Sequence, residues 1–115
     1  MTRKLFVAGN WKMTTSLEEA PALAGAIVEK IGSIEAVDIA VCPPFPYLAT
    51  VAKVLAGSKI ALGAQDVFYE NNGAYTGEVS ATMLRDVGCT YAICGHSERR
   101  HVIGETDEMI NRKVL

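Results

Sequence analysis

The sequence predicts an α/β domain built around a parallel sheet, and three observations support this fold class. Four short apolar runs recur along the chain, and a segment with helical character follows each of them. Half of the 115 residues are hydrophobic (50%), and no linker-like stretch divides the chain. Successive strand-then-helix units form parallel sheets with right-handed crossovers. We therefore expect residues 1–115 to belong to one domain.

The first unit begins with residues 5–8, a short apolar run typical of a buried strand. Ser16 followed by Glu19 makes a capping-box signature for the first helix. Gly32 marks the end of this helix. Pro21 removes one backbone donor, so we expect a late start or a slight bend. Apolar residues repeat at helical spacing at Leu17, Ala20, Leu23, Ala24, Ile27, Val28 and Ile31.

The second and third strands are predicted at residues 39–42 and 60–63, which are short and apolar. Between them we expect a helix over residues 47–55, because Pro46 lies where a first-turn proline is tolerated. A long polar stretch from Gln65 to Glu78 follows the third strand.

The remaining elements are a short helix, a fourth strand and a fourth helix. Ser80 is expected to cap a helix that reaches Val87, residues 91–94 form the fourth strand, and Thr106 caps the last helix. Periodicity does not distinguish a doubly wound open sheet from part of a barrel.

Four polar residues follow the first and fourth predicted strands. Asn10 and Lys12 come after the first strand, and His96 and Glu98 come after the fourth. Parallel α/β folds place ligands at the carboxyl ends of strands, so a cation, an amide and an imidazole there indicate a site for a small anion. The alternatives are a solvated lysine and a hydrogen-bonded structural histidine.

Composition argues against several other classes of function. Eleven basic and 13 acidic residues give a net charge of -2, which does not favour nucleic-acid or anionic-membrane binding. No run approaches the roughly 20 apolar residues of a membrane span. The odd number of cysteines argues against a disulfide framework and for a reducing, cytoplasmic location: Cys42, Cys89 and Cys94.

Cofactor and metal sites are also not indicated. The chain lacks a glycine-rich nucleotide loop between a strand and a helix. Cys94, His96 and Glu98 are two residues apart, but this spacing matches no standard zinc pattern, and Gly95 interrupts the strand. We expect no metal and no cofactor.

Four blocks of sequence together resemble the triosephosphate isomerase family. They run in order along nearly the whole chain and are Ala8-Gly9-Asn10-Trp11-Lys12-Met13, Gly63-Ala64-Gln65-Asp66-Val67, Gly73-Ala74-Tyr75-Thr76-Gly77-Glu78-Val79-Ser80 and Cys94-Gly95-His96-Ser97-Glu98-Arg99-Arg100. The resemblance implies a (β/α)8 TIM barrel, of which this chain covers about the first half. It also implies interconversion of dihydroxyacetone phosphate and glyceraldehyde 3-phosphate through an enediolate, in glycolysis and gluconeogenesis, without cofactor or metal.

The resemblance assigns roles to residues that match the family's motifs. Lys12 corresponds to the cation that holds the substrate phosphate, and Asn10 to the amide that contacts a substrate oxygen. His96 corresponds to the electrophile, a neutral imidazole that donates a hydrogen bond to the carbonyl or enediolate oxygen. Glu98 resembles the family's second acidic residue, with the alternative that it only orients Lys12.

The long loop after the third strand also has a family counterpart. The resemblance implies that Tyr75, Thr76 and Gly77 project into the partner subunit of a homodimer, where Thr76 approaches the active site. Its length exceeds that of an ordinary strand-to-helix loop. The alternative is a mobile surface loop.

Length limits what these 115 residues are expected to do alone. A whole barrel takes about 250 residues, and the family's catalytic glutamate is expected after the sixth strand. We therefore expect the chain by itself to lack the base and to be inactive. One hypothesis is a segment of an active isomerase that pairs with the missing half, and the other is a non-catalytic half-barrel that self-associates through open sheet edges.

Overall fold

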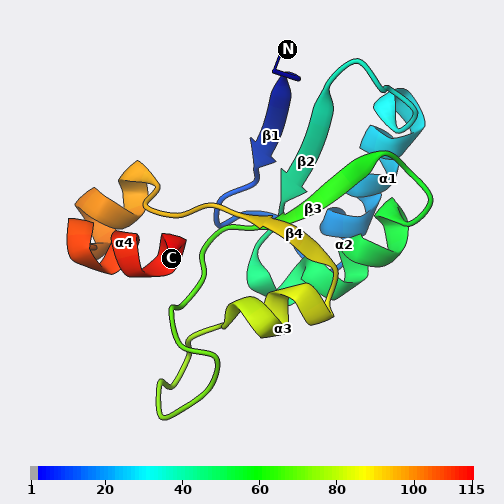
Figure 1. Cartoon of the computed structure of the whole chain (residues 1–115). Coiled ribbons are helices and arrows are strands. Elements are labelled where there is room, and N and C mark those ends of the chain that lie inside the picture. The colour runs from blue at the N-terminus through cyan, green and yellow to red at the C-terminus, as the bar shows by residue number, and fades with distance from the viewer. Residues whose placement is uncertain (1–2) are drawn as a thin grey trace.

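A computed structural model describes residues 3–115 as four parallel strands that alternate with helices (Figure 1). The strands lie in the order β1-β2-β3-β4 and are Phe6–Asn10, Asp38–Cys42, Ile60–Ala64 and Cys89–Ala92. The α-helices α1 to α4 are Glu19–Ile31, Leu48–Leu55, Ala81–Asp86 and Asp107–Val114. Two shorter helical turns, η1 and η2, are Phe45–Tyr47 and Arg99–Ile103. The predicted strand-helix order and parallel sheet are confirmed.

Helix starts follow the side chains that cap them. The Ser80 and Thr106 hydroxyls accept the backbone N–H of Met83 and Met109, as predicted. Ser16 Oγ accepts the N–H of Glu19 at 3.1 Å, and α1 begins at Glu19 itself, the late start expected beside Pro21. The second helix differs slightly from the prediction. The segment that contains Pro46 forms the 3₁₀ turn η1, and α2 begins one residue later than expected, at Leu48.

Every strand has at least one boundary that differs from the prediction, and the differences are largest for β1 and β4. β1 continues through Gly9 to Asn10, because Asn10 still pairs with Cys42 of β2. The prediction of residues 91–94 for β4 is wrong, since the strand runs from Cys89 to Ala92. The register between β3 and β4 shifts at Leu62/Gly63, so pairing begins at buried Cys89, before the apolar run that the prediction used.

The sheet is curved so strongly that side chains of its two outer strands meet. The rings of Phe6 on β1 and Tyr91 on β4 have centroids 4.7 Å apart, although β2 and β3 lie between these strands. Three strand spacings in a flat sheet would separate them by about 14 Å. This curvature is that of a barrel wall and decides against a flat, open sheet.

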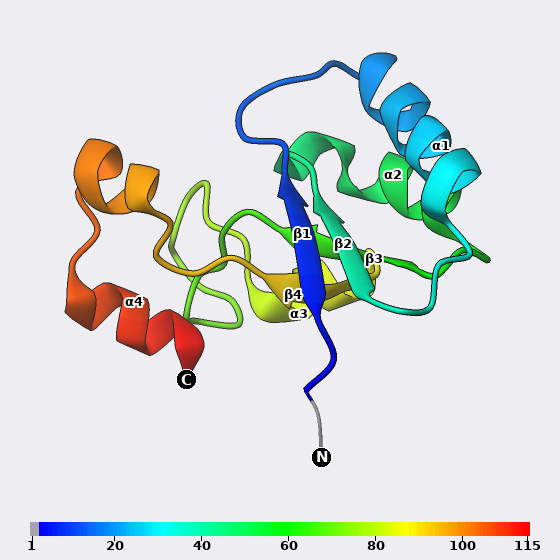
Figure 2. The ribbon, with the colours of Figure 1, turned by 90° about the horizontal axis from the view of Figure 1, so that it is seen from above.

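The core lies between the sheet and the first three helices, which gather along one side of it (Figures 1 and 2). Its central members are Val41, Val51, Leu55, Leu62 and Leu84. α4 lies apart from this core, beyond the turn η2 (Figure 1). Within residues 3–115, no helix is long and apolar enough to cross a membrane.

Candidate active site

The polar residues predicted from strand ends come together at the carboxyl edge of the sheet. Asn10 ends β1, Lys12 follows it, and His96 and Glu98 lie in the segment after β4. All four line one cavity of about 610 Å³, together with Gln65, which directly follows β3. The structure thus brings the four predicted residues together, and the cavity is also lined by residues that the prediction did not assign to the site: Met13, Thr14, Phe45, Gln65, Asp66, Arg99, Val102 and Ile103.

Lys12 has an unusual backbone conformation, with φ of 59°. For a residue with a Cβ this left-handed conformation costs about 1–2 kcal/mol. Two hydrogen bonds hold it. Asn10 Oδ1 accepts the N–H of Lys12 at 2.9 Å, and Gln65 Nε2 donates to the Lys12 carbonyl at 2.8 Å. Gln65 also donates to the Cys42 carbonyl at 2.8 Å, so one amide group joins the ends of β1, β2 and β3.

The Lys12 ammonium points at Glu98. Its Nζ lies 3.2 Å from Glu98 Oε2, and both side chains are about half exposed. This contact matches the alternative in which Glu98 orients Lys12. An exposed pair of this kind contributes only about 0.2–1 kcal/mol to stability, so an incoming anion can compete for the cation.

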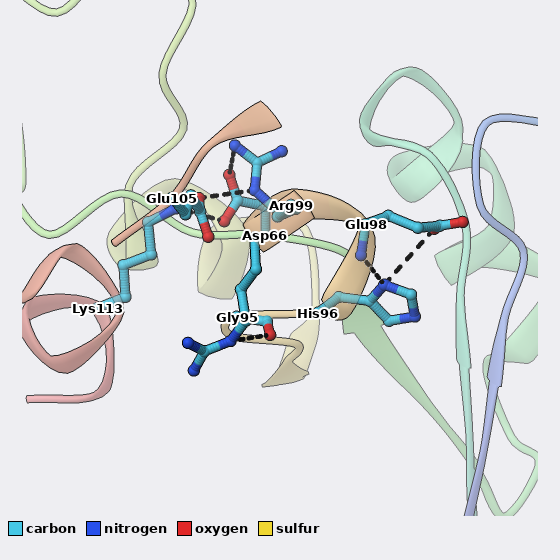
Figure 3. A network of polar contacts seen from close by, with 8 residues as sticks. Asp66, Gly95, His96, Glu98, Arg99, Glu105 and Lys113 are labelled. Atoms are coloured by element: carbon cyan, nitrogen blue, oxygen red, sulfur yellow. Dashed lines mark hydrogen bonds and ion pairs between the residues drawn. The ribbon is translucent and has the colours of Figure 1, made fainter. Parts of the chain in front are cut away.

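The His96 ring is oriented by Glu98. The backbone N–H of Glu98 donates to His96 Nδ1 at 3.1 Å, and Glu98 Oε1 lies 3.5 Å from the same nitrogen (Figure 3). A nitrogen that accepts an N–H carries a lone pair, so in the neutral ring the proton resides on Nε2. The His96 carbonyl in turn accepts the N–H groups of Arg99 and Arg100, which fixes the start of the helical turn. The neutral tautomer therefore has an N–H donor at Nε2.

Sequence reasoning missed a charged network that shares Asp66 and Arg99 with this cavity. Arg99 Nε lies 2.7 Å from Glu105 Oε2, and its Nη2 lies 3.3 Å from Asp66 Oδ2. Lys113 of α4 donates to both Asp66 and Glu105. The available signal was the position of Gln65 and Asp66 just after the third strand, at the same edge as the other site residues. No local signal linked them to Lys113.

The predicted interface loop lies outside this cavity. Tyr75, Thr76 and Gly77 are exposed, and the Tyr75 ring contacts Phe68 with centroids 4.7 Å apart. The N–H of Phe68 donates to the Val79 carbonyl at 2.8 Å and closes the base of the loop. The loop is therefore an exposed projection with an ordered base.

The part of the chain from residue 3 onward holds no cluster of three His, Cys, Asp or Glu placed to bind a metal ion. Cys94 is partly buried, and this burial together with nearby Asp66 raises the pKa of its thiol. A thiol kept protonated is a poor metal ligand.

Fold and site together define part of a TIM barrel with a polar site at the carboxyl edge of its strands. A sequence model of the family described as triosephosphate isomerase matches residues 5–115. The chain therefore belongs to the triosephosphate isomerase family.

Curated relatives named triosephosphate isomerase agree with this assignment. The chain is 53% identical to that of Carboxydothermus hydrogenoformans over 112 residues, which cover 97% of this chain and 45% of the relative. It is 50% identical to that of Moorella thermoacetica, with 98% and 45% covered, and 46% identical to that of Rhodopirellula baltica, with 99% and 45% covered. The chain thus spans a little under half the length of these relatives.

Proposed function

We propose that this chain supplies one half of the active site of a triosephosphate isomerase, which interconverts dihydroxyacetone phosphate and glyceraldehyde 3-phosphate through an enediolate. The observation that carries the proposal is the convergence of Lys12, His96 and Asn10 on one cavity at the carboxyl edge of the sheet. A phosphorylated triose is an anion with a carbonyl, and the cavity offers a cation and an N–H donor.

Lys12 and His96 have separate tasks in this proposal. The Lys12 ammonium exchanges its exposed contact with Glu98 for the substrate anion and offsets negative charge that develops in the transition state. His96 donates from Nε2 to the carbonyl oxygen and then to the enediolate oxygen, while the Glu98 N–H holds its ring in this tautomer. Asn10 keeps Lys12 in its left-handed conformation and contacts substrate from the same position.

The base that removes the proton from carbon lies outside this set of residues in our proposal. Two carboxylates from the described residues line the cavity, and both already face cations. Glu98 pairs with Lys12, and Asp66 pairs with Arg99 and Lys113. We assign proton removal to a residue beyond this half of the barrel, where the family resemblance places the catalytic glutamate.

We further propose homodimerisation of the whole protein through the loop that carries Tyr75, Thr76 and Gly77. The exposed projection of this loop and the contact between Phe68 and Tyr75 support a preformed interface element.

Complementation tests the proposed function. The chain of 115 residues is assayed for triose phosphate interconversion alone and after mixing with the remaining portion of the Carboxydothermus hydrogenoformans relative, which is itself assayed as a control. We expect no turnover from either piece and measurable turnover from the mixture. Turnover by the 115-residue chain alone, after its mass is verified, would refute the assignment of the base to the other half.

The alternative is a non-catalytic half-barrel that self-associates. The outer edges of β1 and β4 are unpaired within residues 3–115, and nearby Leu5 and Val7 are exposed. Chains that associate and never gain activity in the mixture would favour this alternative.

A further inference from the structure

A network of four charged side chains, three of them buried and that of Arg99 30% exposed, forms part of the wall of the candidate site (Figure 3). It joins Asp66 after β3, Arg99 and Glu105 around η2, and Lys113 on α4. The Lys113 and Glu105 side chains are each 2% exposed, and that of Asp66 is 9% exposed. Lys113 Nζ lies 2.7 Å from Asp66 Oδ1 and also donates to Glu105 Oε2.

The network is balanced in charge, with two cations and two carboxylates. Burial disfavours the charged forms of Lys113 and Glu105, but their hydrogen bonds outweigh it, so the pKa of Lys113 is raised and that of Glu105 is lowered. Lys113 and Glu105 therefore stay charged near neutral pH, and the pKa of Arg99 is raised as well. Removing one partner from such a set leaves a buried charge uncompensated, which is strongly unfavourable.

Arg99 connects this network to the site. It is the peptide neighbour of Glu98, and its guanidinium is held by both Glu105 and Asp66. The Arg99 N–H donates to the His96 carbonyl at 2.9 Å. Fixing Arg99 thus fixes the turn in which the Glu98 N–H reaches His96 Nδ1.

Asp66 also connects the network to the other half of the cavity. Its neighbour Gln65 donates to the carbonyl of Lys12. The dipeptide therefore anchors Lys12 on one side and, through Arg99, the segment with Glu98 on the other. The contact of 3.2 Å between Lys12 Nζ and Glu98 Oε2 therefore joins two loops that are both held by the Gln65-Asp66 dipeptide.

We propose that Lys113 is a positioning residue for the His96–Glu98 segment. Lys113 neutralises Asp66 and Glu105 and so lets both carboxylates hold Arg99. Through this contact α4, which lies outside the cavity, sets the orientation of the His96 ring inside it. The importance of this orientation for turnover rests on the proposed function. The positioning role of Lys113 is tested by measuring the His96–Glu98 geometry in the absence of substrate, so a failed isomerase assay would not refute this role.

The test compares Lys113→Met with wild type in the ¹⁵N-labelled 115-residue chain at pH 8. We expect the Glu98 amide to exchange with solvent at least about tenfold faster in the variant, because its acceptor is no longer held in place. We expect the His96 ring nitrogens to shift from a fixed Nε2–H tautomer towards the average of two tautomers, the behaviour expected of exposed His101. Lys30→Met, at an exposed position of α1, is the matched control and leaves both signals unchanged.

A second variant keeps the test decisive if Lys113→Met does not fold. Glu105→Gln/Lys113→Met retains the Asp66–Arg99 pair without an extra buried charge, so it is expected to fold with intermediate Glu98 exchange and His96 shifts. The proposal is overturned if either variant folds and matches wild type in both the Glu98 exchange rate and the His96 ring signals.

Discussion

Lys12 adopts a left-handed backbone conformation that glycine accepts without strain. Replacing it by glycine and by methionine separates this strain from the loss of the ammonium. Both variants lose the half-exposed contact with Glu98, which is worth about 0.2–1 kcal/mol. Only Lys12→Gly also relieves the backbone. We therefore expect Lys12→Gly to be more stable than Lys12→Met.

The expected difference follows from two opposing contributions. The left-handed conformation costs a residue with a Cβ about 1–2 kcal/mol, and the greater freedom of glycine in the unfolded chain returns about 0.4–1 kcal/mol of this. The net advantage of Lys12→Gly is on the order of 0.5–1 kcal/mol. With a urea slope of about 1–3 kcal/mol per molar, its midpoint lies a few tenths of 1 M above that of Lys12→Met.

Urea unfolding followed by circular dichroism measures this difference. Thr15 provides a control, because its φ is 74° and its buried Oγ1 has no hydrogen-bond partner within residues 3–115. Thr15→Gly is expected to stabilise the chain by at least as much while leaving Lys12 in place. A Lys12→Gly chain that unfolds at lower urea than Lys12→Met would refute the strain argument.

Three further predictions concern packing, pH and association. Gly63→Ala places a Cβ 2.6 Å from Cys42 Sγ and is expected to lower the free energy of unfolding by about 1–3 kcal/mol, a penalty that disappears in a Cys42→Ala background in a double-mutant cycle. The pKa of Glu105 in the folded chain is below its ordinary value of 4.5, so the ionised carboxylate stabilises the fold fully above pH 4.5, and this stabilisation is lost as the pH falls through the folded pKa. The free energy of unfolding of Glu105→Gln should therefore lack this loss on acidification. The 115-residue chain by itself is expected to associate through its open strand edges, and a monodisperse monomer by light scattering would contradict this.

Local interactions explain what the sequence could predict of the fold. A cap such as Ser80 or Thr106 depends on one hydrogen bond to a residue three positions away, so its signature is readable in the chain. The boundary of β4 depends on its pairing with β3, where the register shifts at Leu62/Gly63. The apolar run at residues 91–94 carries no trace of that shift, and the prediction therefore misplaced the strand.

The candidate site likewise combines residues that the sequence could predict with residues that depend on tertiary contacts. Asn10, Lys12, His96 and Glu98 were predictable because parallel strands bring their carboxyl ends to one edge. The contact of Lys113 with Asp66 joins residues 47 positions apart, so no spacing rule reveals it. The role of Gln65 depends on the left-handed turn at Lys12, which the sequence pattern did not indicate.

A chimera tests the central proposal most directly. The part of the Carboxydothermus hydrogenoformans relative that aligns with this chain, 45% of its length, is replaced by this chain, and kcat for triose phosphate interconversion is measured with and without His96→Gln. We predict an active chimera in which His96→Gln lowers kcat by about 10²–10³-fold, the usual effect of losing one donor to a developing oxyanion, with unchanged circular dichroism. A folded chimera that is inactive, or whose kcat is unaffected by His96→Gln, would contradict the proposal.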